Sequence, residues 1–165
     1  HQEDSVELKH FLEEAGGSNL WMPSLCQSVP PPPLRFLDVM DEISTLCDRV
    51  GEDKLRAMVA AFYHRVRVDD LIGPMYPPDD WEGSEKRLAD FIVYRFGGPQ
   101  TYIEERGHPR LRGRHMPFPI DLAARDRWLD LMGASMREVE IPADDAPLIG
   151  AFFAQLADMM RNRPG

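Results

Sequence analysis

The 165-residue sequence lacks the features that mark several common classes of protein. Its two cysteines, Cys26 and Cys47, have neither metal-ligand nor redox-motif spacing, so we expect free thiols in a reducing cytoplasm rather than a disulfide. No apolar run approaches the roughly 18 residues of a membrane span, and no stretch alternates as a β-strand does. The formal net charge of -9 argues against nucleic acid or an anionic membrane as the main partner.

What the sequence does contain is apolar residues at helical spacing. The clearest helix is predicted over residues 52–68, where the apolar positions form one stripe. Val39, Ile43, Leu46 and Val50 fit one face of an earlier helix that ends at Gly51. Further helices are predicted over residues 83–96, 122–139 and about 144–160. The prediction is one all-α domain, long enough to bury a substantial core.

Residues 97–128 are rich in cations although the chain as a whole is acidic. This segment contains two histidines, His108 and His115, among the arginines Arg106, Arg110, Arg112 and Arg114. Four cations beside a histidine indicate a buried anion or an anionic cofactor, and the imidazole indicates a metal. The prolines at 109, 117 and 119 limit helix to short pieces, so His115 is predicted near the end of a brief helical turn.

The segments GGPQTY, ERGHPRLRGRH, PF and ARDRWL, in this order and spacing, resemble group II truncated hemoglobins. The likeness extends upstream through FYHRV at 62–66, MYPPDD at 75–80 and EKRLADF at 85–91, without a gap between Tyr63 and Trp128. It covers roughly the last three quarters of the chain. It implies a truncated globin fold, a two-over-two helical sandwich around a heme, over residues 39–165.

Residues 1–38 lie outside the resemblance and are interpreted as an N-terminal extension. Residues 6–15 are predicted to form a short amphipathic helix that stops at two glycines. The run of prolines at 30–33 indicates an extended, semi-rigid connector. A binding site for a proline-recognition module is the less favoured alternative.

The resemblance makes His115 the ligand of a heme iron and the metal site of the protein. His108 is the rival ligand, but its neighbours Gly107 and Pro109 predict a turn. Arg114 and Arg87 are the candidates for the heme propionates, because charge-assisted pairs suit carboxylates, with solvated surface pairs as the alternative. Apolar side chains are expected to wall the cofactor, a b-type heme: Leu88, Phe91, Phe118, Trp128 and Met132.

The resemblance places five residues around the bound gas: Tyr63, Tyr76, Ser84, Leu88 and Trp128. Tyrosine hydroxyls and the indole N–H are hydrogen-bond donors in an otherwise apolar space. Donors aimed at oxygen stabilise it more than they stabilise an uncharged ligand such as carbon monoxide. Individually each aromatic residue is more often core filling, but together at the family positions they indicate ligand binding.

The expected function is therefore the binding of oxygen, carbon monoxide and nitric oxide. Storage, delivery or sensing without turnover is one hypothesis. The other is an enzyme that converts nitric oxide to nitrate or reduces peroxide, with an electron-donating reductase as partner. A third hypothesis is a helical protein without heme that uses its cluster of arginines to bind an acidic or phosphorylated partner. The sequence does not distinguish a protein that carries oxygen from an enzyme that reacts with it. It also does not distinguish a monomer from a homodimer.

Overall fold

The computed structural model describes residues 36–164. The predicted helix at residues 6–15, the proline run at 30–33 and Cys26 lie outside these residues. The chain divides into two compact units, His1–Glu42 and Ile43–Gly165. In the first unit the structure describes most of one helix, α2 (Phe36–Ile43).

In the second unit every regular element is a helix, and none of residues 36–164 forms a strand, which confirms the all-α prediction. None of the helices described combines the length and apolar character of a membrane span. In chain order the elements are α3 (Leu46–Val50), α4 (Glu52–Val66), the 3-10 turn η1 (Gly73–Met75), α5 (Trp81–Arg95), α6 (Thr101–Arg106), α7 (Leu111–His115), α8 (Leu122–Glu138) and α9 (Ala146–Met160).

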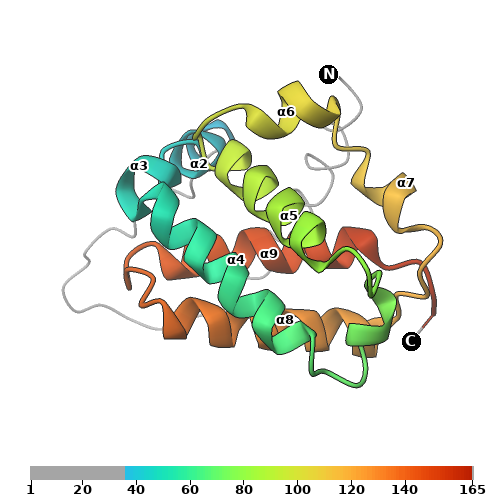
Figure 1. Cartoon of the computed structure of the whole chain (residues 1–165). Coiled ribbons are helices and arrows are strands. Elements are labelled where there is room, and N and C mark those ends of the chain that lie inside the picture. The colour runs from blue at the N-terminus through green and yellow to red at the C-terminus, as the bar shows by residue number, and fades with distance from the viewer. Residues whose placement is uncertain (1–35, 165) are drawn as a thin grey trace, which may run out of the picture. The chain divides into compact units, whose positions relative to one another are not determined.

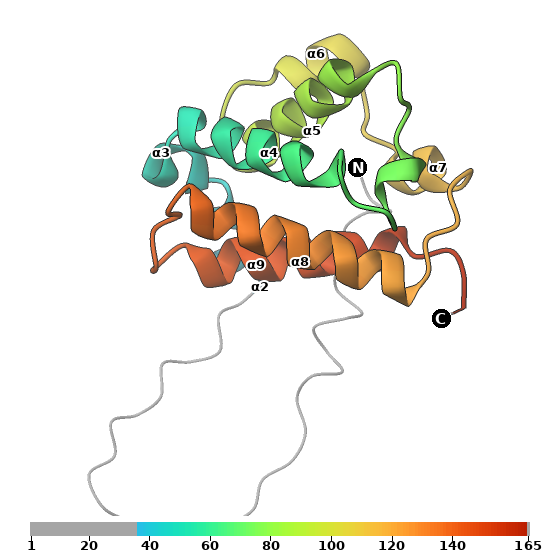
Figure 2. The same ribbon diagram turned by 60° about the horizontal axis from the view of Figure 1, so that its bottom comes forward.

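The long helices of this unit form two layers. Figure 2 shows α4 and α5 in one layer and α8 and α9 in the other. Helix α4 contacts both α5 and α8, and α8 packs against α9, so α4 joins the two layers (Figure 1). The short helices attach at the edges, with α6 against α5 and α7 against α9. This is the two-over-two arrangement that the resemblance implied.

The apolar stripe predicted on α4 is the centre of the core. Its members share complete burial, with 0% exposure at Leu55, Met58, Val59, Phe62 and Val66. Residues three and four apart lie on one face of a helix, so this spacing presents one continuous apolar surface to α5 and α8. The helix ends two residues earlier than the predicted residue 68.

One local prediction was wrong. Residues 39–50 do not form one helix, because a turn at Ser44 separates α2 from α3. In a continuous helix the Cys47 N–H would bond Ile43, but it donates instead to the carbonyl oxygen of Phe96 at 2.8 Å. Next to Phe96, Gly97 has φ +88°, and a Cβ there would lie 1.7 Å from the Ser44 carbonyl oxygen. The close approach of the two segments therefore interrupts the helix.

Helix α6 is one of the short pieces to which helix was expected to be limited in this segment, although its position was not predicted. It is six residues long and buries one large side chain, Tyr102. The ring of Tyr102 packs edge-on against Phe91 of α5, with ring centroids 5.4 Å apart. This tertiary contact stabilises a helix that is too short to persist alone.

Candidate functional site

His115 is the last residue of α7, a helix of five residues, and it is half-buried. Its Nδ1 lies 2.7 Å from the carbonyl oxygen of Leu111, one turn earlier. A carbonyl oxygen only accepts, so Nδ1 carries the proton and donates it. In the neutral imidazole the other ring nitrogen, Nε2, then has a lone pair that is available to a metal.

The other described histidines lie in different surroundings. His64 on α4 and His108 between α6 and α7 are both exposed. The Nδ1 of His108 accepts a bond from the Arg110 backbone N–H at 3.3 Å. Residues 36–164 contain no cluster of three or more histidine, cysteine or acidic side chains suited to a metal ion. Of the three described histidines, only His115 is partly enclosed by the fold.

Tyr63 links the two helices of one layer. It lies on α4 with 4% of its surface exposed, and its hydroxyl donates to the carbonyl oxygen of Ser84 on α5 at 2.9 Å. Burial raises the pKa of Tyr63 far above its usual value. The single hydroxyl proton is used by this bond, so in this structure Tyr63 has no further proton to offer to a ligand.

Tyr76 and Trp128 form a second polar pair. Burial raises the pKa of Tyr76 to about 12, although a hydrogen bond from the indole N–H of Trp128 acts in the opposite direction. Accepting that bond occupies one lone pair of the Tyr76 hydroxyl and leaves its proton available for donation. The two tyrosine rings meet edge to face, with centroids 5.5 Å apart. The structure therefore brings together Tyr63, Tyr76 and Trp128, which come from three separate segments.

The residues expected to wall a cofactor fall into two groups. Phe91 and Met132 are buried, with 4% and 1% of their surface exposed. Leu88, Phe118 and Trp128 are half-buried, so each keeps apolar surface that a flat apolar group would cover. Ser84 is itself 7% exposed, and its carbonyl faces Tyr63.

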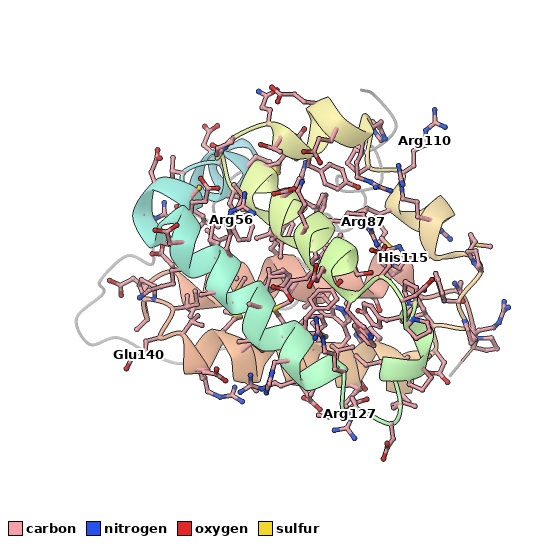
Figure 3. The ribbon with its side chains drawn as sticks, in the orientation of Figure 1. Arg56, Arg87, Arg110, His115, Arg127 and Glu140 are labelled. Atoms are coloured by element: carbon pink, nitrogen blue, oxygen red, sulfur yellow. The ribbon has the colours of Figure 1, made fainter. Side chains whose placement is uncertain are left out.

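The two arginines proposed for an anionic group have different partners. Arg87 on α5 donates through Nη2 to an Asp80 carboxylate oxygen at 2.7 Å and to the Ser84 hydroxyl at 2.9 Å (Figure 3). Arg114 on α7 is exposed and donates through Nε to the carbonyl oxygen of Pro109 at 2.8 Å. Arg87 is thus held by a carboxylate of the chain, whereas among residues 36–164 the Arg114 guanidinium bonds only through Nε.

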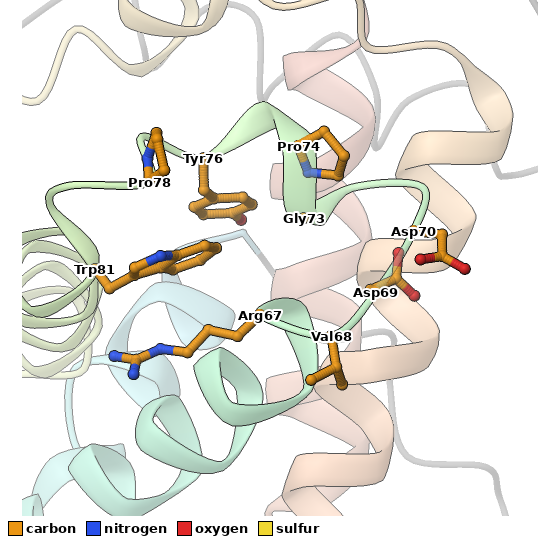
Figure 4. A pocket seen from close by; sticks show the side chains of 9 residues that line it. All are labelled: Arg67, Val68, Asp69, Asp70, Gly73, Pro74, Tyr76, Pro78 and Trp81. Carbon is orange, nitrogen blue, oxygen red and sulfur yellow. The ribbon is translucent and has the colours of Figure 1, made fainter.

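The sequence analysis did not single out Trp81, the first residue of α5. Its indole stacks on the Tyr76 ring, with centroids 5.9 Å apart and planes 15° from parallel. The Arg67 guanidinium makes a cation–π contact with the Trp81 ring, 5.5 Å from its centroid. These side chains help to line a surface hollow of about 390 Å³, shown in Figure 4. The Trp81 ring thus lies between Tyr76 and the Arg67 guanidinium. An aromatic residue just after the MYPPDD segment was the available signal.

Comparison with known proteins shows the family of the chain. The family model for bacterial-like globins matches residues 45–162. The chain is 39% identical over 97 residues to Group 2 truncated hemoglobin YjbI of Bacillus subtilis (strain 168), a match that spans 59% of this chain and 73% of that protein. The chain belongs to the group II truncated hemoglobins.

Solved truncated hemoglobin structures show the same fold. The hemoglobin of Chloroflexus aurantiacus superposes with a TM-score of 0.70 and 39% identity, covering 72% of this chain and 98% of that one. A truncated oxygen-avid haemoglobin from Bacillus subtilis superposes with a TM-score of 0.68 and 33% identity, covering 72% and 99%. As a truncated hemoglobin, the chain uses a heme cofactor to bind diatomic gases such as oxygen.

The side chains of this truncated hemoglobin fit such a cofactor. A heme needs an imidazole nitrogen for its iron, apolar walls for the ring and polar groups beside the gas. His115 presents an unprotonated Nε2, Leu88 and Phe118 keep uncovered apolar surface, and the Tyr76 hydroxyl retains a proton.

Proposed function

We propose that the chain binds a b-type heme through Nε2 of His115 and holds oxygen tightly beside Tyr76 and Trp128. The bond from His115 Nδ1 to the Leu111 carbonyl supports this most strongly, because it fixes the tautomer that a metal ligand requires. When bound, the heme iron supplies reversible coordination of a diatomic gas. The chain supplies the imidazole, the apolar enclosure and the hydrogen bonds.

Arg114 is the better candidate for a propionate, and Arg87 is the second. Within the described part of the chain the exposed Arg114 guanidinium bonds only through Nε, so its two terminal nitrogens suit a carboxylate. Arg87 already pairs with Asp80 and would have to share its guanidinium between two carboxylates. Leu88, Phe118 and Trp128, which are half-buried, would contact the heme ring, and the buried Phe91 and Met132 would complete the apolar pocket.

We further propose that the gas is held by one direct donor, the Tyr76 hydroxyl, rather than by three. The Tyr63 proton is used by Ser84 and the Trp128 N–H by Tyr76, which leaves the Tyr76 proton for the ligand. Trp128 also orients the Tyr76 hydroxyl by donating to it. A related Bacillus subtilis protein is described as oxygen-avid, and donors of this kind would give the present chain the same property.

Tight binding favours redox chemistry or sensing over delivery, because a protein that releases oxygen slowly is a poor carrier. Conversion of nitric oxide to nitrate and reduction of peroxide are the reactions proposed, with an electron-donating reductase as partner. Simple carriage or storage is the alternative, and rapid oxygen release would favour it. A buried, free Cys47 suits the cytoplasm that we propose as the location.

Replacement of His115 tests the proposal. The variant His115→Gly should remain helical, retain hemin weakly and recover part of its Soret absorption when imidazole is added. His108→Gly is the matched control, because His108 is the exposed histidine of the same segment. If His108→Gly loses the heme and His115→Gly does not, the assignment is wrong.

A further inference from the structure

The segment that contains His115 has few means of holding its own position. Helix α7 has five residues and none of them is buried. Arg110, which precedes the helix, has φ 44°, a conformation that few residues other than glycine adopt. Pro117 and Pro119, which follow, have no backbone N–H to donate. A helix this short is not stable by itself, so contacts from elsewhere in the chain must fix it.

Those contacts come from Asn162, which is half-buried two residues beyond the end of α9. Its Nδ2 donates to the carbonyl oxygens of His115 at 3.1 Å and Phe118 at 2.8 Å. Its Oδ1 accepts from the Ile120 N–H at 3.1 Å. The backbone N–H groups of Asn162 and Arg163 donate to the Ile120 carbonyl at 2.9 and 3.1 Å. We call this set of hydrogen bonds the Asn162 clamp.

The Asn162 clamp suits the side-chain amide of asparagine. Both N–H bonds of the amide face carbonyl oxygens, and its oxygen faces an N–H. A carboxylate of the same shape would place an oxygen against two carbonyl oxygens, with no proton between them. The amide therefore satisfies all three backbone groups where an aspartate would satisfy one.

The Asn162 clamp holds the backbone of His115, and α7 orients the ring of the same residue. The His115 carbonyl accepts from Asn162 and from the Phe118 N–H at 3.0 Å, while the His115 ring donates to Leu111. The backbone of His115 is thus tied to the end of α9, and its imidazole is tied to α7. Together these bonds determine where Nε2 points.

We propose that Asn162 is a positioning residue for His115, holding the imidazole in the direction that iron ligation requires. The proposal rests on the proposed role of His115 as the iron ligand. Without the Asn162 clamp, α7 is free to shift relative to α9, and the bond from Nε2 to the iron loses its alignment.

The test compares Asn162→Asp, Asn162→Ala and Arg163→Ala in the full-length, heme-loaded protein. Arg163→Ala is the matched control, because that side chain bonds only the Asn162 carbonyl and its backbone N–H is retained. Resonance Raman spectroscopy of the ferrous protein gives the frequency of the iron–histidine stretch. Transfer of heme to an excess of apomyoglobin gives the rate of heme loss, and circular dichroism gives the helix content and Tm.

Both Asn162 variants should shift or broaden the iron–histidine band and lose heme at least about tenfold faster, while Arg163→Ala matches the wild type. A wild-type band in either folded Asn162 variant would overturn the proposal. Loss of helix in both variants would also overturn it, in favour of a general role in folding. If His115→Gly keeps the wild-type spectrum, the proposed iron ligand itself is wrong. If His115→Gly behaves as expected and both Asn162 variants keep the wild-type iron–histidine band and rate of heme loss, only the positioning role of Asn162 is wrong.

Discussion

The hydroxyl of Tyr63 donates its proton to the carbonyl oxygen of Ser84, 2.9 Å away on the neighbouring helix. This bond distinguishes Tyr63 from Tyr76, although both tyrosines lie in the same aromatic cluster. The Tyr63 hydroxyl links α4 to α5, whereas we propose that the Tyr76 hydroxyl offers its proton to a ligand. The two tyrosines should therefore respond differently to the same chemical change.

Tyr63→Phe should change stability more than oxygen release. The variant removes one buried hydrogen bond, worth about 0.5–1.5 kcal/mol in the free energy of unfolding, while the Ser84 carbonyl keeps its backbone partner within α5. Denaturant titration of the heme-free protein measures this cost, and stopped-flow mixing measures oxygen release. A large acceleration of oxygen release with unchanged stability would show that the Tyr63 proton serves the ligand instead.

Asp90 should make stability depend on pH in the acid range. It is 4% exposed on α5, and it accepts hydrogen bonds from Lys86 and Arg56. Burial acts to raise the pKa of Asp90, but these bonds outweigh it and hold the pKa below its usual value. Since the folded pKa is the lower one, the stabilisation is complete above the unfolded pKa and is lost as pH falls through the folded pKa.

Asp90→Asn should accordingly lower the free energy of unfolding by about 1–3 kcal/mol at neutral pH. The difference from the wild type should shrink as pH falls below the usual range of an aspartate. Glu105→Gln is the matched control, because it removes only the exposed pair with Lys86, worth less than about 1 kcal/mol. Urea titrations at several pH values measure both variants, and a pH-independent Asp90→Asn difference would contradict the account.

Deleting residues 1–33 should leave heme binding and the ferrous oxygen-bound spectrum essentially unchanged. The family match begins at residue 45, and we propose that the globin domain extends from residue 39. Absorption spectra and thermal melts of the truncated and full-length proteins make the comparison. A truncated protein that fails to fold or to take up heme would show that the extension belongs to the core.

Features that depend on one segment were predictable from the sequence. The stripe on α4 repeats within 12 residues, and the prolines around His115 limit the length of α7 directly. The family pattern supplied what periodicity does not, namely which histidine and which aromatic residues to consider together. It could not indicate that Tyr63 and Tyr76 use their protons differently.

Features that depend on two distant segments were missed. Asn162 and Ile120 are 42 residues apart, and neither has a local pattern that indicates the other. The break between α2 and α3 is similar, because it depends on Phe96 and Gly97 approaching Ser44 and Cys47. Helix α6 was missed because its stability comes from the contact of Tyr102 with Phe91 rather than from its own six residues.

Trp128 bears on the central claim that hydrogen bonds hold the oxygen. Its indole N–H donates to Tyr76, and its ring packs on Phe62 and Phe153 with centroids 5.0 and 5.6 Å away. Phenylalanine removes the N–H that bonds Tyr76 and keeps one aromatic ring in that contact, so Trp128→Phe disturbs packing less than Trp128→Ala would. A hydrogen bond to a ligand that carries charge is worth about 1.5–3 kcal/mol, and each 1.4 kcal/mol is about tenfold in equilibrium.

The most direct measurement is the rate of oxygen release from the ferrous protein by stopped-flow mixing, beside the rate of carbon monoxide release. We expect slow oxygen release in the wild type and release at least about tenfold faster in Trp128→Phe, because affinity changes appear mainly in dissociation. Carbon monoxide release should change much less. Fast oxygen release from the wild type, or an equal change for both gases in Trp128→Phe, would contradict the account and favour a simple carrier.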